Sequence, residues 1–443
     1  MKRLVLVVVM LAVVGAFTPT DAVAKKREQA RREVLSRSRG YYKDLFMDGG
    51  VALTSRTFLP AVPFLGLSLE YFISAKGDSL AEKNASRQAA VFCGNEDDSN
   101  GWLLYPDGSP RYRMIYVNGG SAIKHARSMG EAAAENIQKY VANGGSYLGT
   151  CAGAFIASKG GMDHKGKVHY GDKYWHLWQG FAHRTRLTKS STTMQVERKS
   201  PLLRYFDFGG DYKIDSVRHN GGCYAYDGGT EGLVAGTEPL TRYLFKNNGK
   251  VKIDGKISSW AYKPSAESGR VVLCGSHPES VGQGERLEYM SAMMLYAMDG
   301  NAKPTVKGDL QVGEVREMNK RTEDNDPAYT RIGDRQYHHF VVDVPRKCKK
   351  MTIKLDGYKG ENSFDLTLCA KYGELAFHDN TLIKDVSRGC KKQLVVKSPK
   401  AGRWYVSVFC ETTVNASVGR FGTYYRTNRR VLNGVPYKVV VEY

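Results

Sequence analysis

The sequence predicts an α/β fold, with helices on both faces of a parallel sheet, followed by an antiparallel β-sandwich. As far as about residue 300, short apolar runs alternate with helical patterns, which is typical of parallel strands joined by helices. The runs 114–117 and 271–274 are apolar throughout, as expected of strands buried on both faces. Beyond residue 300, short β-type runs separated by polar turns predominate, which favours a small sandwich.

The α/β domain is expected over residues 44–300. Its clearest helix is 122–141, which is rich in alanine, amphipathic and closed by Gly144-Gly145. Residues 160–262 are rich in turns, Tyr, Trp and His, and we expect hairpins there. The expected strands are 44–48, 69–74, 89–93, 114–117, the run before Cys151, 232–236, 243–246 and 270–275; the expected helices are 55–65, 79–88, 122–141 and 286–298.

The C-terminal part is expected to contain a linker with a first strand, 301–330, and the sandwich itself, 331–443. Its apolar residues recur in short runs bounded by Gly, Pro, Asn and Asp, which is the pattern of antiparallel strands. The expected strands are 337–344, 351–355, 364–370, 392–396, 404–409 and 435–442.

The chain begins with the pattern of a signal peptide, predicted over residues 1–24. Met1-Lys2-Arg3 is a short basic start, an apolar run follows to Phe17, and Ala22-Val23-Ala24 is a small-x-small cleavage signal. The apolar run is too short to span a bilayer, so we expect a protein that is not transmembrane. The predicted location is secreted, extracellular or periplasmic, with a basic N-terminal lead over 25–43. A retained N-terminal anchor is the alternative.

The net charge is +20, and the excess of Lys and Arg is spread over the chain. A diffuse basic surface favours contact with anionic surfaces such as envelope polymers. Export and the lack of a nucleic-acid motif make a nucleic-acid partner unexpected. A solvated basic surface without a partner is the alternative.

The sequence contains eight cysteines, which in an exported chain suggest disulfides. Four of them, Cys348, Cys369, Cys390 and Cys410, fall in the last quarter and are candidates for two bridges, with three pairings open. Cys274 lies in an apolar run, where cysteine acts as a small hydrophobic residue.

Cys151 stands at the centre of a Gly-x-Cys-x-Gly turn between an expected strand and a helix start. Small neighbours are needed where a nucleophile sits on a strained turn, and helix N–H groups favour thiolate over thiol. The alternative is a buried structural cysteine in an ordinary turn.

The partners of such a nucleophile are a base and an acid that orients it, and His277-Pro278-Glu279 supplies both at the end of a buried strand. We therefore expect Cys151 as nucleophile, His277 as base and Glu279 as orienting acid. Backbone N–H groups of Gly120 and Ala152 are the expected oxyanion donors, and Gly119 and Gly120 let a substrate carbonyl approach.

Three segments carry a resemblance to a known family: Gly145 to Ala154, His219 to Tyr224, and Gly269 to Glu279. Over about residues 44–300 the chain resembles the class I glutamine amidotransferase-like fold, and within it the biotin–protein ligase N-terminal domain family. The resemblance implies a flavodoxin-like sheet and places Cys151, His277 and Glu279 at the triad positions. Glutaminases of this fold usually carry glutamine four residues after the nucleophile, where this chain has Phe155. The resemblance therefore points to hydrolysis of an amide, peptide or γ-glutamyl-type bond in a small molecule or peptide, without a cofactor.

The C-terminal part resembles the bacterial pre-peptidase C-terminal domain. The likeness rests on Tyr337 to Pro345, Ser363 to Leu368, Pro399 to Val408 and Tyr437 to Val441. Such domains accompany secreted hydrolases, which agrees with the predicted signal peptide.

Two further functions compete with a hydrolase: an exported binding protein that kept the fold without the reaction, and a redox-sensing thiol protein that uses Cys151. His164, His169, His176 and His183 match no standard zinc spacing, so no metal is expected. Tyr170, Tyr174, Trp175 and Trp178 either line a cleft or cover the sheet.

Overall fold

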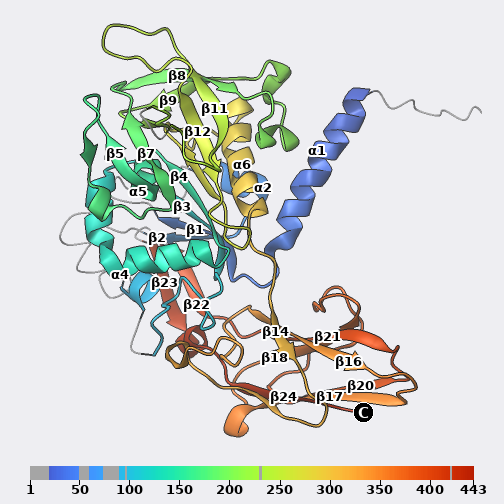
Figure 1. Cartoon of the computed structure of the whole chain (residues 1–443). Helices are drawn as coiled ribbons and strands as arrows, with labels where there is room; N and C mark the ends of the chain where they lie inside the picture. The colour runs from blue at the N-terminus through green and yellow to red at the C-terminus, as the bar shows by residue number, and fades with distance from the viewer. Residues whose placement is uncertain (1–18, 49–58, 73–88, 95–96, 229–231, 420–421) are drawn as a thin grey trace, which may run out of the picture.

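The computed structural model describes residues 19–48, 59–72, 89–94, 97–228, 232–419 and 422–443. It has a mixed α/β part and a C-terminal part whose sheets are antiparallel except for the parallel pair β14-β16 (Figure 1). The helices are α1 Pro19–Leu35, α2 Ala61–Leu65, α4 Ala122–Ala142, α5 Ala152–Ala157 and α6 Gly284–Asp299.

A nine-stranded sheet, ordered β2-β1-β3-β4-β13-β12-β11-β8-β9, forms the centre of the α/β part. The first five strands are parallel to their neighbours, whereas the last four pair in antiparallel fashion. The strands are β1 Lys43–Asp48, β2 Leu69–Phe72, β3 Tyr112–Val117, β4 Ser146–Thr150, β8 Ser190–Val196, β9 Lys213–His219, β11 Glu238–Leu244, β12 Ile257–Tyr262 and β13 Val271–Cys274.

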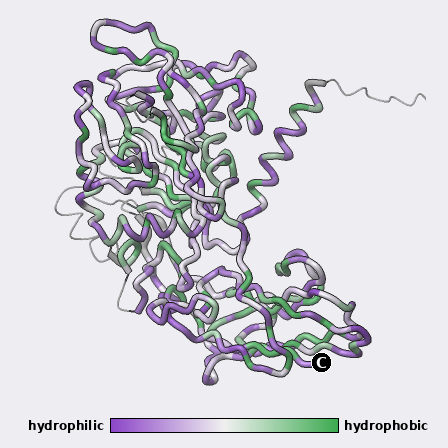
Figure 2. Tube along the Cα trace, viewed as in Figure 1, coloured by the Kyte–Doolittle hydropathy of each residue, from purple (hydrophilic) through white to green (hydrophobic). Residues whose placement is uncertain are grey.

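Both faces of this sheet are covered by helices, and successive strand residues alternate between two apolar cores. Ile115 and Val117 belong to the core that contains α4 and α5 residues, whereas Met114 and Tyr116 belong to the core that contains α1, α2 and α6 residues. Side chains alternate across a strand, so a strand between two helical layers is buried on both faces, as β3 and β13 are. Their residues are apolar except for Arg113 of β3, whose buried charge is paired with Asp44 at 3.1 Å. Figure 2 shows the hydrophobic colour concentrated along these central strands.

A smaller sheet, ordered β10-β7-β5-β6, follows Cys151 in the chain and lies beside α5 and α4. Its strands are β5 Ser158–Met162, β6 Val168–His169, β7 Trp178–Arg184 and β10 Cys223–Ala225. β5 and β7 are parallel, and the other two pairs are antiparallel. This sheet supplies one wall of the site described below.

The C-terminal part contains a five-stranded sheet, β14-β16-β21-β18-β19, a four-stranded sheet, β15-β24-β17-β20, and a two-stranded hairpin, β22-β23. Its strands are β14 Val306–Asp309, β15 Arg316–Met318, β16 Tyr337–Val344, β17 Lys350–Gly357, β18 Leu366–Tyr372, β19 Lys384–Asp385, β20 Lys392–Lys397, β21 Gly402–Cys410, β22 Asn415–Gly419, β23 Gly422–Thr427 and β24 Tyr437–Glu442. Six of these lie on the six runs that the sequence predicts.

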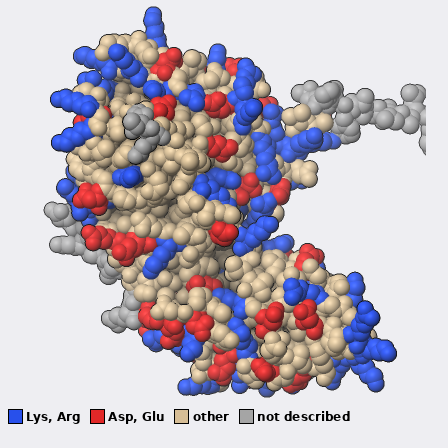
Figure 3. Space-filling view, in the orientation of Figure 1, with Lys and Arg blue, Asp and Glu red and all other residues tan. Residues whose placement is uncertain are grey.

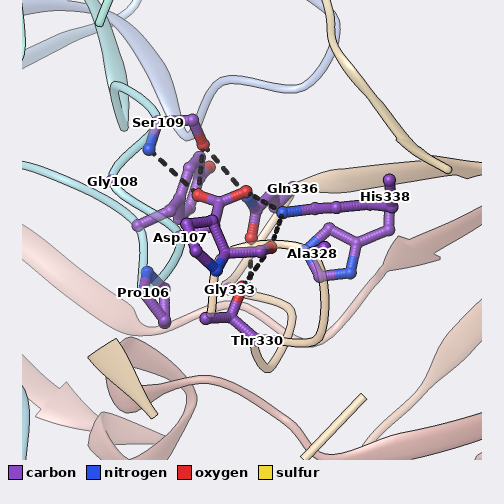
Figure 4. A network of polar contacts seen from close by, with 12 residues as sticks. Pro106, Asp107, Gly108, Ser109, Ala328, Thr330, Gly333, Gln336 and His338 are labelled. Carbon is purple, nitrogen blue, oxygen red and sulfur yellow. Dashed lines mark hydrogen bonds and ion pairs between the residues drawn. The ribbon is translucent and has the colours of Figure 1, made fainter. Parts of the chain in front are cut away.

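Buried polar contacts join the two parts. The Arg111 guanidinium donates to both carboxylate oxygens of Asp334 at 3.1 and 2.9 Å, and both side chains are almost fully buried. Figure 4 shows a second such contact, in which Gln336 faces Asp107 and Ser109 and donates to Asp107 at 2.8 Å. Buried charges are tolerated only when paired in this way, so these contacts fix the two parts against each other.

Asp107 also binds the ammonium group of Lys307, which comes from β14. Burial acts to raise the pKa of Asp107, but the Lys307 ammonium and the hydrogen bond from Ser109 hold it below its ordinary value. The hairpin β22-β23 reaches the α/β part as well, since the Tyr425 hydroxyl donates to Glu70 of β2 at 2.9 Å.

Some local predictions are wrong. Residues Ala89–Cys93 are helical, not a strand, and the Ala90 and Val91 carbonyls accept the N–H of Trp102. A five-residue apolar run fits either structure, so its periodicity does not decide. Residues 232–236 form a turn, in which Thr237 N–H donates to the Val234 carbonyl, and the strand begins at Glu238.

The expected disulfides are not formed. Cys348, Cys369, Cys390 and Cys410 are free, as are the other four cysteines. Cys390 and Cys410 are buried and donate instead to backbone carbonyls of Phe364 and Thr412. Cys390 and Cys410 act as small apolar residues in the C-terminal part, and a count of cysteines cannot distinguish such buried thiols from bridged ones.

The predicted helix 79–88 and most of the predicted signal peptide lie outside the described residues. The predicted cleavage site, Ala22-Val23-Ala24, lies in α1. Within the described ranges no helix is both long and apolar enough to cross a membrane. On the face shown in Figure 3, Lys and Arg are spread over both parts, with Asp and Glu among them.

Candidate active site around Cys151

Cys151 lies at the turn between β4 and α5, in a backbone conformation that non-glycine residues rarely adopt. Its φ is 48° and its ψ is −103°. The turn is held because the Cys151 N–H donates to the Cys274 carbonyl of β13 at 2.9 Å. Such strain persists only where the surroundings enforce it, and it is common at catalytic residues.

Glycines on either side of Cys151 make this turn sterically possible. A β-carbon on Gly153 would lie 2.1 Å from the Val117 carbonyl oxygen, and one on Gly149 would lie 2.5 Å from the backbone of Gly153. Neither position accepts a side chain without movement of the backbone. The Gly-x-Cys-x-Gly pattern is therefore a packing requirement of the strand-to-helix turn.

His277 follows β13 and lies beside Cys151. Its Nδ1 is 2.9 Å from Oε1 of Glu279, and its backbone N–H donates to the Arg218 carbonyl. Burial acts to lower the pKa of His277, but hydrogen bonds to Cys151 and Glu279, together with their negative charges, raise it to about 10. The imidazole thus connects the sulfur on one side with a buried carboxylate on the other.

The loop after β3 completes this arrangement. A β-carbon on Gly119 would lie 2.2 Å from Cε1 of His277, so only glycine leaves room for the imidazole. The N–H groups of Gly120 and Ala152 have no hydrogen-bond acceptor among the described residues. Both residues line the cavity that contains Cys151, so these amides are available to an oxygen of a bound molecule.

The cavity over Cys151 has a volume of about 590 Å³. The central sheet provides the Gly120 loop and Cys151, the smaller sheet provides residues around β5 to β7, and the loop after β9 closes one side. Its lining residues are Gly120, Ser121, Ala122, Ile123, Cys151, Ala152, Phe155, Asp163, His164, His169, Tyr170, Tyr174, Arg184, Arg186, Asn220 and Gly221.

A buried network behind His277 was not predicted as part of the site. His219 bridges Thr185 Oγ1 and Ser276 Oγ, both at 2.7 Å. Burial and the neighbouring His277 lower the pKa of His219 to about 4, so its ring is neutral at pH 7. The sequence clue to this network was the segment His219 to Tyr224. This segment packs closely against Gly275, where only glycine fits at position 222, because a β-carbon there would lie 1.7 Å from the Gly275 carbonyl oxygen.

Arg184 and Arg186 are two further cavity residues that the sequence did not single out. Nothing in the sequence marks them, because isolated arginines at a strand end are ordinary surface residues. Only the fold brings them to the wall of the cavity that contains Cys151.

The other residues weighed from sequence fall into two groups. Tyr170, Tyr174, His164 and His169 line the cavity, whereas Trp175 and Trp178 are buried in the core. No group of three or more His, Cys, Asp or Glu side chains suited to a metal ion occurs in the parts of the chain that the structure describes.

Cys223 and Cys274 are also buried near Cys151. Burial raises the pKa of the Cys274 thiol to about 12 and that of Cys223 well above its ordinary value. These two thiols are structural, as the sequence indicates for Cys274.

Residues 109–294, which contain every element of this site, match the family model described as "Biotin-protein ligase, N terminal". The chain matches no curated protein sequence. One similar solved structure is the pre-peptidase C-terminal domain of a collagenase from Bacillus anthracis. The match covers 32% of this chain and 99% of that domain, with 11% sequence identity and a TM-score of 0.18. Another is PliG of Aeromonas hydrophila, a periplasmic inhibitor of g-type lysozyme. That match covers 24% of this chain and 75% of PliG, with 14% sequence identity and a TM-score of 0.15. The predicted N-terminal family is thus confirmed for residues 109–294, and a pre-peptidase C-terminal domain is among the structural neighbours.

Proposed function

We propose that this protein is a cysteine-dependent hydrolase of amide-type bonds, with Cys151 as nucleophile, His277 as its proton partner and Glu279 as the orienting acid. One observation carries the proposal: His277 lies between Cys151, which helps to raise the pKa of the imidazole, and Glu279, whose Oε1 is 2.9 Å from Nδ1, beside a cavity. A nucleophile, a base and a group that orients the base define this class of site.

The reaction follows from the charges. Glu279 raises the pKa of His277 through its hydrogen bond and its charge, and an imidazolium beside the sulfur is the partner that a thiolate nucleophile needs. The thiolate attacks the amide carbonyl, and the carbonyl oxygen, now negative, accepts hydrogen bonds from the Gly120 and Ala152 amides. His277 donates its proton to the leaving amine, and a thioester on Cys151 remains. Water, deprotonated by His277, then attacks the thioester, releases the acid and restores the thiolate–imidazolium pair.

The residue four positions after Cys151 favours hydrolysis over ammonia transfer. Phe155, four residues after Cys151, lies in the cavity wall and offers an apolar ring where a glutamine-specific site uses a polar amide. The bonds that fit are those of amides, peptides or γ-glutamyl-type compounds.

We also propose the finer architecture and the location that the sequence predicts. The order β2-β1-β3-β4-β13 of the parallel strands supports a flavodoxin-like arrangement, and the two larger C-terminal sheets support a sandwich. The signal-peptide pattern supports export, where the basic surface would meet anionic envelope polymers.

The test is turnover of a panel of amide, dipeptide and γ-glutamyl p-nitroanilides by the purified protein. We expect release of p-nitroaniline that Cys151→Ser abolishes and that Cys348→Ser, at a partly exposed thiol outside the site, leaves unchanged. Turnover that survives Cys151→Ser would contradict the proposal. A protein that binds these compounds without hydrolysing any of them would be the exported binding protein, and a Cys151 disulfide in the native protein would favour the redox-sensing thiol.

A further inference from the structure

Arg184 and Arg186 lie in the wall of the cavity that contains Cys151, and the hydrolytic steps do not use them. Both side chains belong to exposed residues. Within the described residues, neither guanidinium forms an ion pair with a carboxylate. Arginines without an acidic partner in a concave site are available to an anionic ligand.

The backbone between the two arginines is anchored by Thr185. Thr185 is buried, with 3% of its surface exposed, and its Oγ1 is 2.7 Å from Nε2 of His219. His219 in turn binds Ser276, the residue before His277. Because Thr185 is turned inward, Arg184 and Arg186 flank it on the side of the cavity. The same buried network thus anchors both the arginine pair and the loop that carries His277.

The charge balance of the cavity wall favours an anion. Asp163 is the one acidic residue in the wall, and His169 binds its carboxylate at 2.9 Å. This hydrogen bond with His169 lowers the pKa of Asp163, so the wall carries one ionised carboxylate, already engaged by His169, against the two guanidinium groups. The first turn of α4, at Ala122 and Ile123, also lines the cavity, and the N-terminus of the helical segment before the break at Gly130 adds a weak positive potential.

We infer that the substrate is an amide whose acyl group carries a free carboxylate, and that Arg184 and Arg186 bind this carboxylate while Cys151 attacks the amide carbonyl. The inference rests on the proposed function, because it assigns the substrate class of the same site. A guanidinium binds a planar carboxylate through two parallel N–H donors, which fixes its orientation as well as its charge. An acidic acyl group therefore presents its carbonyl to Cys151, and the neutral analogue loses that orientation.

The first test compares two alkylating agents that differ in charge. Iodoacetate carries a carboxylate and iodoacetamide does not, so the ratio of their rates at Cys151 reports attraction of an anion to the cavity. We expect the iodoacetate rate divided by the iodoacetamide rate to fall about tenfold in Arg184→Gln/Arg186→Gln. A tenfold change corresponds to the loss of about one charge-assisted hydrogen bond. Lys189→Gln removes a cation from the same segment outside the cavity wall, and should leave the ratio unchanged. An unchanged ratio in the double variant would overturn the inference.

The second test needs neither turnover nor a reactive thiol. Glutarate should raise the unfolding temperature of the wild type and of Lys189→Gln, whereas the neutral glutaramide should not, and Arg184→Gln/Arg186→Gln should lose the rise. Stabilisation by inorganic phosphate in place of glutarate would contradict a carboxylate site. Lack of turnover on every amide, with both arginine effects present, would contradict the hydrolase proposal and leave the anion site standing.

Discussion

Gly119 and His277 share a space that holds only one side chain. A β-carbon on Gly119 would lie 2.2 Å from Cε1 and 2.9 Å from Nδ1 of the imidazole. The backbone at Gly119 is not in the left-handed region, so alanine is excluded there by the ring alone. The Gly-Gly loop after β3 therefore sets the position of His277 as well as that of the Gly120 amide.

Gly119→Ala should displace the imidazole from Cys151 with little loss of stability. We expect turnover to fall about 100-fold, the usual effect of misplacing a reacting group by about 1 Å. Gly249→Ala is the matched control, because a β-carbon there meets nothing within 4 Å. Equal activity of Gly119→Ala and Gly249→Ala in the p-nitroanilide assay would show that the position of His277 does not matter.

Glu279→Gln should lower the pKa of His277, since the Glu279 charge and hydrogen bond help to raise it to about 10. The imidazole would then lose its proton at lower pH, and alkylation of Cys151 near pH 6 to 7 would slow. Turnover should fall by about 10²- to 10⁴-fold, as for loss of a general acid–base partner. An alkylation profile that does not move in Glu279→Gln would remove Glu279 from the mechanism.

Asp334→Asn should destabilise the whole protein, because it leaves the Arg111 charge buried and unpaired. The expected loss in the free energy of unfolding is about 3–5 kcal/mol, measured by urea denaturation. Asp343→Asn is the control, since its pair with Arg403 is exposed, with 65% and 57% of the two side chains accessible. That change should cost less than about 1 kcal/mol. Equal effects of the two substitutions would mean that the buried pair does not join the two parts.

His339 should make stability fall as the pH is lowered below 6.5. Burial lowers its pKa to about 4, and the ring lies against Tyr337 and Phe377, with Nδ1 2.7 Å from Ser407 Oγ. Between pH 6.5 and 4 the unfolded chain binds a proton that the folded chain does not, which costs about 1.4 kcal/mol per pH unit. His339→Gln should flatten the slope of the unfolding free energy against pH by this amount. The exposed His164→Gln should not, and identical slopes in all three proteins would refute the assignment.

The sequence was sufficient for two central parallel strands, because residues 114–117 and 271–274 are apolar throughout and are followed by Asn118 and Gly275. It was also sufficient for the neighbourhood of Cys151, His277 and Glu279, since each follows a buried strand and the carboxyl ends of parallel strands meet at one edge. These predictions depend on local pattern and on one general rule of sheet topology.

Other features depend on contacts that no local pattern encodes. Arg184 and Arg186 reach the cavity only because β7 pairs with β5, and His219 reaches Ser276 only because the end of β9 pairs with the segment after β13 through Arg218 and His277. The helical run Ala89–Cys93 and the free thiols of Cys390 and Cys410 were mispredicted for the same reason. Their apolar character indicates that these residues are buried. Whether they form a helix or a strand, or a free thiol or a disulfide, depends on their neighbours in the folded protein.

The most direct test of the central claim is the pH dependence of Cys151 alkylation by iodoacetamide, followed by mass spectrometry of the peptide that contains Cys151. If His277 holds a thiolate on Cys151, half-maximal reactivity should lie well below the free-thiol value of about 8.5, and His277→Ala should move it up to that value. A midpoint near 8.5 that His277→Ala does not change would contradict the account.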